Sequence, residues 1–325
     1  MKVSVKVLGA LVMALISSIS VFGQDDVQYR ANLIKKFYSM GTASVNGTYY
    51  PLGNSLSRLF CRKLKKIVTL AEPTAGSIAN VEYLRKKQID LALMQSDVAW
   101  MAYHGSGNFA GNSLKELRVM ASLYSEKIQI VVRADSPVKT LVDLKDRKIA
   151  VGEKDSGSAA GAILILENAG LKQGDYELVY ERFTKSTESL LDGYIDALYY
   201  VGGVPADGIA RLAEKTPIRL IEIPESIVTK LTGSYPYYCS ESVQGGAYKG
   251  QKDKISTLGF KALLTCTENM ATEDVLTMLS VIYENPKLIS DNNEVLVEVN
   301  KADAMIGVDK SMLHEGASRF FSATK

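Results

Sequence analysis

Two Gly-Ser pairs, Gly76-Ser77 and Gly157-Ser158, are the residues in this sequence whose types and spacing best suit anion binding. Each pair opens an amphipathic stretch that we expect to be a helix. Backbone N–H groups at a helix start can hold an anion without a charged side chain. Either pair alone is more often a simple helix cap. Two such starts facing one cleft would suit a ligand with one or two carboxylates.

Loops rich in Gly, Ser, Thr and Asn, and poor in Lys and Arg, follow several predicted strands. They are residues 42–50, 72–77, 95–97, 154–158 and 202–205. In open α/β sheets ligands bind beyond the carboxyl ends of the strands, so these loops form the expected ligand site. Tyr49, Tyr50 and Tyr124 lie at loop or strand ends. An amphipathic ring suits a cleft wall there, and a half-buried structural role is equally common.

Residues for catalysis are few. The chain has two histidines, His104 and His314, and we expect each at the surface or in packing. It contains no G-x-S-x-G, GxxxxGK[ST], GxGxxG or H-E-x-x-H motif. We therefore expect no catalytic residues, no metal site and no cofactor, and a protein that is not an enzyme.

Composition and charge are those of a globular protein. The chain has 325 residues, 46% apolar and 23% charged, with a formal net charge of +2. A dedicated nucleic-acid binder would carry a basic excess, so we expect no nucleic-acid partner. The length predicts two domains or one two-lobed unit.

Residues 1–23 have the three-part layout of a secretory signal peptide. Lys2 and Lys6 precede an apolar run at 7–16, and Val21-Phe22-Gly23 supplies small residues before Gln24. The alternative is a membrane anchor, but a spanning helix needs roughly 20 apolar residues. Cleavage after Gly23 would remove two of the 38 basic residues and leave 36 against 36 acids. We predict an exported, periplasmic protein.

Export permits disulfides. Cys239 and Cys266 lie in two strand-like stretches and can pair. Cys61 would then be left over, and we expect it to be a buried free thiol.

Strand patterns alternate with helix patterns, which predicts an α/β protein with a parallel sheet. Ser77 and Asp97 are candidate caps of the helices they begin, and the long β-rich stretch 119–132 is interrupted near Ser125-Glu126. The predicted strands are 33–40, 67–70, 91–94, 119–132, 148–151, 197–201 and 256–265, and the predicted helices are 51–64, 77–87, 141–145, 159–169, 205–215 and 273–283.

One short internal repeat in the sequence supports two similar lobes. Residues 88–93 read QIDLAL and residues 194–198 read YIDAL. Each segment combines a helix exit, an Ile-Asp pair and a buried strand.

Several motifs occur in a fixed order along the mature chain. Residues 41–53 read GTASVNGTYYPLG, followed by EPTAGS at 72–77, ALMQSDVA at 92–99, LYSE at 123–126, SGS at 156–158, and DG with IDA at 192–197. Together these stretches resemble the TAXI family, the extracytoplasmic solute-binding subunits of TRAP transporters. The resemblance extends from about residue 40 to residue 320.

The resemblance implies a two-lobed, type II periplasmic-binding-protein fold with hinged lobes around a central cleft. Lobe 1 would comprise residues 24–126 and 236–325, and lobe 2 residues 127–235. It further implies a small carboxylate ligand, such as a glutamate-like amino acid or an organic acid, and a TRAP membrane permease as partner. We expect a monomer. By position, the cleft residues are Thr42, Ala43, Ser44, Tyr49, Gly76, Ser77, Gln95, Tyr124, Ser156, Gly157 and Ser158.

The sequence departs from the family pattern at several of these loops. Ala43 and Ala75 stand where the family usually has smaller or more polar residues, and their methyl groups narrow the predicted cleft. Ala159 and Ala160 stand where an arginine is often found, which removes a charge-assisted contact to a carboxylate.

Two alternatives to a transport protein remain open. A binding protein that reports to a membrane receptor would have the same sequence features. An enzyme on the same fold would need a general base in the cleft, and no motif supplies one.

Overall fold

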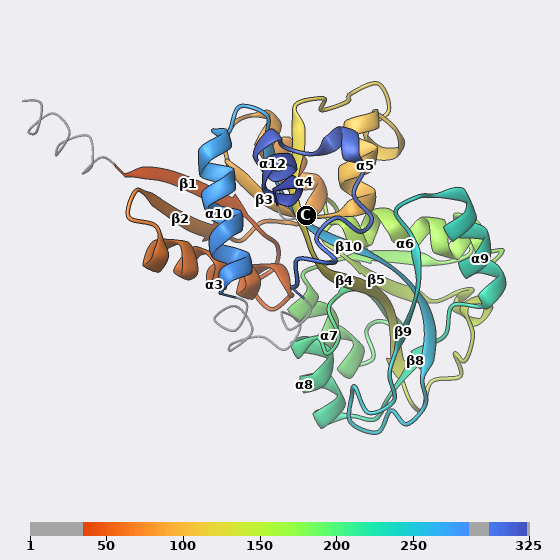
Figure 1. Ribbon diagram of the computed structural model, residues 1–325. Helices are drawn as coiled ribbons and strands as arrows, with labels where there is room; N and C mark the ends of the chain where they lie inside the picture. Colours follow the sequence, from red (N-terminus) through yellow and green to blue (C-terminus); the bar gives the residue numbers. More distant parts are fainter. Residues whose placement is uncertain (1–34, 286–298, 324–325) are drawn as a thin grey trace, which may run out of the picture.

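The computed structural model describes residues 35–285 and 299–323. The predicted signal peptide and the first residues of the predicted strand 33–40 lie outside this part. The described chain forms one ten-stranded sheet flanked by helices (Figure 1). Its strand order is β2-β1-β3-β10-β4-β7-β5-β6, with β8 on β4 and β9 on β10.

The two ends of the sheet are built alike. In each, a central strand pairs in parallel with two neighbours, and helices follow the strands. One end contains β1 (Lys36–Gly41), α3 (Tyr49–Lys63), β2 (Ile67–Glu72), α4 (Ser77–Arg85), β3 (Leu91–Gln95) and α5 (Ser96–His104). The other contains β5 (Lys148–Gly152), α6 (Gly157–Asn168), β6 (Glu177–Tyr180), α7 (Phe183–Leu191), β7 (Ala197–Gly202) and α8 (Asp207–Lys215).

The repeated Ile-Asp pair in the sequence corresponds to the same hydrogen bond in both halves of the sheet. Asp90, just before β3, accepts the N–H of Ser39 on β1 at 2.9 Å. Asp196, just before β7, accepts the N–H of Lys148 on β5 at the same distance. A carboxylate that accepts a backbone N–H fixes the entry of one strand beside another, and both halves use it at the equivalent place.

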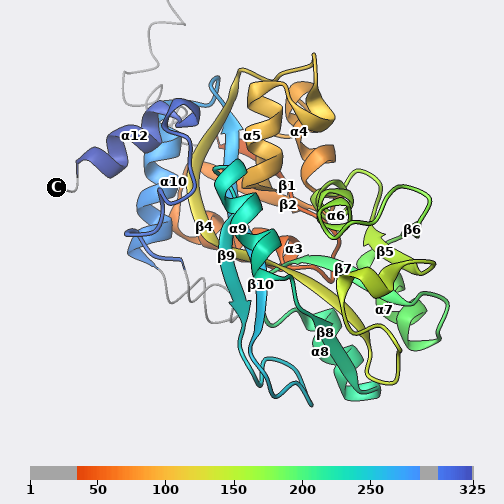
Figure 2. The ribbon, with the colours of Figure 1, turned by 90° about the vertical axis from the view of Figure 1, so that its right-hand side faces the viewer.

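Two long strands, β4 (Leu117–Arg133) and β10 (Ile255–Thr267), join the halves (Figure 2). They are antiparallel to each other, and β10 pairs with β3 while β4 pairs with β7. The predicted interruption of β4 near Ser125-Glu126 is not a break in the strand, although the register with β10 shifts just before it, between Ser122 and Tyr124. Both residues are paired with β10, opposite Lys261 and Phe260. The polar side chains there have partners, so they do not break the strand.

The remaining elements extend or cover this frame. They are the short 3-10 helices η1 (Gly107–Phe109), η2 (Leu141–Leu144) and η4 (Lys310–Met312), the strands β8 (Ile218–Ile221) and β9 (Cys239–Val243), and the helices α9 (Glu225–Ser234), α10 (Thr272–Glu284) and α12 (Glu315–Ser322).

The buried side chains divide into two sets, which define the lobes used below. The first lobe's cores include buried residues of β4 up to Tyr124 and of β10 from Ala262 onward. The second lobe's cores take β4 from Ile128 and β10 up to Phe260. Side chains of the segment 237–260 therefore pack with the second lobe's cores, whereas the resemblance implies that residues 236–325 belong to the first lobe. The reason is β9, which pairs with the 255–259 half of β10.

All three cysteines are free thiols. The predicted pairing of Cys239 with Cys266 is wrong, because Cys239 lies opposite Gly259 on β10. Cys266 lies farther along the same strand, roughly 23 Å away at about 3.3 Å per residue, whereas a disulfide needs Cα atoms within about 7 Å. Cys61 is exposed on α3, so the prediction of burial is also wrong.

Candidate ligand-binding cleft

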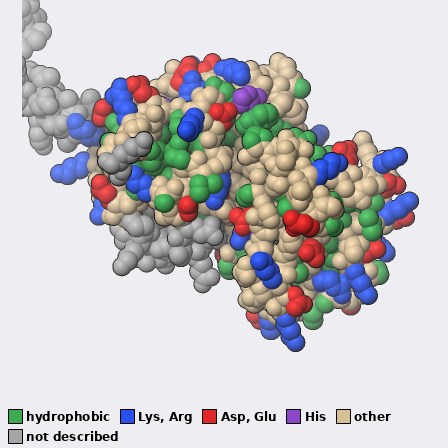
Figure 3. All heavy atoms as spheres, turned by 45° about the vertical axis from the view of Figure 1, so that its right-hand side comes forward, with side chains coloured by type: hydrophobic (Ala, Val, Ile, Leu, Met, Phe, Trp, Pro, Cys, Tyr) green, Lys and Arg blue, Asp and Glu red, His purple; other side chains and the backbone are tan. Residues whose placement is uncertain are grey.

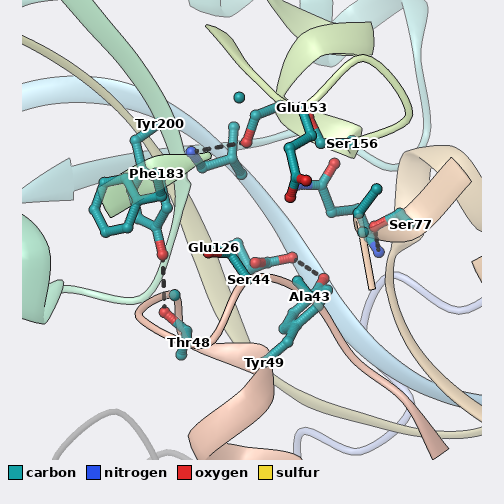
Figure 4. Close-up of a pocket in the computed structure, with 18 of the residues that line it drawn as sticks. Ala43, Ser44, Thr48, Tyr49, Ser77, Glu126, Glu153, Ser156, Phe183 and Tyr200 are labelled. Atoms are coloured by element: carbon teal, nitrogen blue, oxygen red, sulfur yellow. Dashed lines mark hydrogen bonds between the residues drawn. The ribbon is translucent and has the colours of Figure 1, made fainter. Parts of the chain in front are cut away.

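A cavity of about 70 Å³ lies between the two lobes. We call it the cleft pocket (Figure 4). Most of the predicted cleft residues line it: Ala43, Ser44, Tyr49, Gly76, Ser77, Gln95, Ser156, Gly157 and Ser158. Thr42 and Tyr124 do not line it. Thr42 is fully buried, with its hydroxyl donating to the Glu72 carbonyl at 2.6 Å, and Tyr124 packs in the first lobe's core.

Asn80 on α4 positions the first lobe's loops. Its side-chain amide donates to the carbonyl oxygens of Thr42 and Leu93, both at 2.8 Å. These bonds tie the end of β1 to β3 and to the start of α4. A Cβ at Gly41 would lie 2.7 Å from the Asn80 amide oxygen, so this close packing requires glycine.

Ser77 and Ser158 make the same contact in the two lobes. The Ser77 hydroxyl accepts the N–H of Gln95, at the end of β3, at 3.1 Å. The Ser158 hydroxyl accepts the N–H of Val201, near the end of β7, at 3.2 Å. Each bond joins the first turn of a helix to a strand end. Because each oxygen accepts a bond from a strand, its own proton can point to a ligand.

The helix caps differ from the sequence prediction. Ser77 does not cap α4, whose cap position is Gly76 at φ 124°. Asp97 does not cap α5, because its carboxylate accepts the N–H of the next residue, Val98, at 2.7 Å. Ser156 does cap α6, by accepting the Ala159 N–H at 3.1 Å.

Two buried polar atoms that belong to pocket-lining residues have no hydrogen-bond partner within the described part of the chain. They are the side-chain oxygen of Gln95 and the hydroxyl of Tyr199. A buried polar group without a partner costs about 1–3 kcal/mol. A ligand that bonds these atoms would recover that cost.

Glu126 on β4 lies at the pocket and is 2% exposed. The Tyr49 hydroxyl donates to one of its carboxyl oxygens at 2.5 Å. Burial raises the pKa of Glu126 to about 8, although the Tyr49 bond acts in the opposite direction, and the nearby charge of Asp97 adds to the rise. Glu126 is therefore mostly protonated at neutral pH and can donate a hydrogen bond. Sequence reasoning missed its role, although an acid within an apolar β-rich stretch was a visible signal.

The lining contains two acids, Glu126 and Glu153, and no lysine or arginine among its described residues. Positive potential at the pocket therefore comes from the N-termini of α4 and α6, whose dipoles and first N–H groups favour an anion.

The two lobes contact each other on both sides of the pocket. On one side, the Ala79 N–H on α4 donates to the Asp155 carbonyl at 3.2 Å. On the other, the Gly203 N–H donates to the Thr48 hydroxyl, which also lies 3.3 Å from the Tyr200 hydroxyl (Figure 4). Asn46 adds a bond from its amide to the Thr184 hydroxyl at 2.5 Å. The structure is thus a closed arrangement of the lobes.

Within residues 35–285 and 299–323, no group of three or more His, Cys, Asp or Glu is placed to hold a metal ion. In the same described segments, no helix has the length and apolar character needed to cross a membrane.

The family model of the NMT1-like family matches residues 40–323. The chain belongs to the NMT1-like family. Solved structures similar to this NMT1-like chain include those of several binding proteins. An ancestral arginine-binding protein bound to arginine has 14% identity and a TM-score of 0.51, over 80% of this chain and 98% of that one. The predicted two-lobed α/β fold of periplasmic binding proteins is confirmed.

Two further matches have lower TM-scores. The periplasmic aliphatic sulphonate binding protein SsuA from Escherichia coli has 15% identity and a TM-score of 0.46, with 80% of this chain and 79% of that one covered. The alkanesulfonate-binding protein SsuA from Xanthomonas axonopodis pv. citri, bound to MOPS, has 13% identity and a TM-score of 0.48, with coverages of 89% and 84%.

Proposed function

We propose that this protein is an extracytoplasmic solute-binding protein that captures a small carboxylate in the cleft pocket by hinge closure. It then delivers the carboxylate to a TRAP-type membrane permease. The observation that carries the proposal is the cleft pocket itself, which both lobes line. Buried polar atoms of Gln95 and Tyr199 in it have no hydrogen-bond partner among the residues that the structure describes.

The lining supports a carboxylate as the ligand. The first turn of α6 supplies backbone N–H groups and the positive end of a helix dipole. The hydroxyls of Ser77 and Ser158 and the protonated Glu126 supply further donors. A single water needs about 10–15 Å³ of such cavity volume, so a cavity of about 70 Å³ suits an acid of a few heavy atoms.

The way the lobes are joined supports hinge closure. β4 and β10 pass from one core to the other, so a rotation between residues 124 and 128 on β4 and near residue 261 on β10 leaves both cores intact. A ligand favours the closed state only through contacts it makes with both lobes there. We place the first lobe at residues up to 126 and from 261, and the second at 127–260.

The permease, the export signal and the monomeric state rest on the sequence alone. The TAXI-like motifs support a TRAP permease as partner, and the layout of residues 1–23 supports secretion to the periplasm. A protein that reports the same ligand to a membrane receptor is the second candidate. Capture of the permease from membranes by the ligand-loaded protein, and not by the ligand-free one, would favour transport.

A thermal-shift screen against amino acids, monocarboxylates and dicarboxylates tests the proposal. A ligand at a hundredfold excess over its dissociation constant stabilises a protein by about 2.7 kcal/mol. We expect at least one small carboxylate to raise the melting temperature saturably, and its amide or alcohol analogue to have a smaller effect. Stabilisation by none of the acids, or equally by the neutral analogues, would contradict a carboxylate ligand.

A further inference from the structure

A second and larger cavity, of about 760 Å³, also lies between the lobes. We call it the aromatic pocket. It is lined by α5 of the first lobe and by α6 and residues 234–238 of the second. The first turn of α6 separates it from the cleft pocket, because Ser156–Ser158 line one cavity and Ala159–Gly161 the other.

Aromatic side chains from both lobes form its wall. The rings of Trp100 and Tyr237 have centroids 5.6 Å apart, across the lobe boundary. Tyr237 is 5.0 Å from Tyr238 and 5.5 Å from Tyr235. Small-molecule sites are typically concave, of about 300–1,000 Å³, and lined by aromatic and apolar groups with a few polar ones. The aromatic pocket has this composition and size.

Asp97 is the polar group that this wall surrounds. It lines the pocket and is 1% exposed. One carboxyl oxygen accepts the Val98 N–H. Neither oxygen has a cationic partner within ion-pair distance in the described part of the chain. A buried carboxylate without a cation is costly unless a ligand supplies one. Burial raises the pKa of Asp97 to about 7, which is the expected response to that missing charge.

Two other charged residues line the pocket, Lys154 and Glu167. Both are exposed, so water screens them, and their charges cancel. The buried charge that an occupant meets is that of Asp97.

We propose that the aromatic pocket is a second ligand site, which binds an organic monocation. Its ammonium group lies at the pocket wall close to the buried Asp97 carboxylate, which attracts it through space, and its apolar body lies against the rings of Trp100 and Tyr237. Aromatic faces attract a cation within about 6 Å of the ring centroid. An occupant would touch α5 and α6 at once, and so would bridge the two lobes independently of any acid in the cleft pocket.

Trp100 gives a local signal for the test, because it is the only tryptophan in the chain. The test cation is benzyltrimethylammonium, with benzyl alcohol as the neutral comparison. We expect a saturable change in Trp100 fluorescence, with affinity for the cation about tenfold or more above that for the alcohol. Asp97→Asn should lower the affinity for the cation by a similar factor. Asp253→Asn, an exposed change of equal charge, should not.

Equal binding of the cation and the alcohol, or no saturable change with either, would overturn the proposal. So would an Asp97→Asn variant that binds the cation as tightly as the wild type. The comparison of cation with alcohol uses the unmodified protein, so it decides the question even if Asp97→Asn does not fold. The outcome is separate from that of the carboxylate screen, because a small acid in the cleft pocket lies on the other side of the α6 start.

Discussion

The two lobes present different chemistry to the cleft although they are built alike. Each ties a helix start to a strand end through a serine hydroxyl, Ser77 in the first lobe and Ser158 in the second. The first lobe adds one buried acid and an amide oxygen, from Glu126 and Gln95 at the pocket. The second adds the capped start of α6. The shared serine bond is therefore architectural, and the difference between the faces determines what ligand the closed cleft suits.

The titration of Glu126, the buried acid of the first lobe, should give the largest of the predicted effects, a change in the free energy of unfolding with pH. The pKa of Glu126 is about 8 in the folded protein, whereas that of a glutamate exposed to water in the unfolded chain is about 4.5. The folded protein thus binds more protons between these values, so its free energy of unfolding falls as pH rises from about 4.5 to about 8. The loss should be on the order of a few kcal/mol. Urea unfolding at several pH values measures it.

Glu126→Gln keeps an acceptor for Tyr49 and removes the titration. The free energy of unfolding of this variant should depend less on pH below about 8. The pH dependence that remains should come from Asp97, whose pKa is about 7. An unchanged pH dependence in this variant would contradict a raised pKa of Glu126 in the folded protein.

The second largest effect is expected at the contact between the two lobes across the cleft pocket. A Cβ at Gly157, at the start of α6, would lie 1.9 Å from the Gln95 side-chain oxygen of the other lobe. Gly157→Ala should therefore oppose closure and weaken binding of the carboxylate found in the screen by roughly 10- to 100-fold. Calorimetric titration measures this. Gly233→Ala on α9 is the matched control and should bind normally, because no atom of the described residues lies within 4 Å of the new Cβ.

The serines test whether the lobes are equivalent. Ser77→Ala and Ser158→Ala each leave a buried strand N–H without its acceptor, so each should lower the free energy of unfolding by about 1–3 kcal/mol. Both should also weaken ligand binding, since each removes a donor from the pocket. Serine-to-threonine changes retain the hydroxyl and should be milder. A loss of stability in one variant alone would show that the two bonds are not equivalent.

The smallest effect on ligand affinity is expected from the hydrogen bond between Asn46 and Thr184, which joins the two lobes. Asn46→Ala removes the bond to Thr184 in the closed form. A single hydrogen bond of this kind contributes about 0.5–1.5 kcal/mol, so the ligand affinity should fall about two- to tenfold. The melting temperature of the ligand-free protein should change little. A loss of stability without a loss of affinity would contradict a role in closure.

The sequence predicted the frame of the fold well, because its central strands are buried on both faces. β3 and β7 are fully buried and read as apolar runs. The strand-like stretch at Cys239 is β9. The sequence did not predict β6, α7, β8 or α9. β6 has two exposed ends and half-buried middle residues, and β8 is only four residues long, so neither shows a clear strand pattern. Their pairing depends on partners distant in sequence.

The candidate site was predictable where loop chemistry is local. The Gly-Ser pairs lie at helix starts and line one cavity, as their spacing indicates. Glu126 was not predicted, because its burial depends on Tyr49, which approaches from α3. The aromatic pocket was not predicted either, since Trp100 and Tyr237 come from different lobes.

Small-angle scattering of the mature protein, with and without the carboxylate identified in the screen, tests the central claim most directly. We predict that the saturated wild type has a smaller radius of gyration than the ligand-free protein. Gly157→Ala should contract less at the same saturation. An unchanged radius of gyration in the saturated wild type would contradict capture by hinge closure.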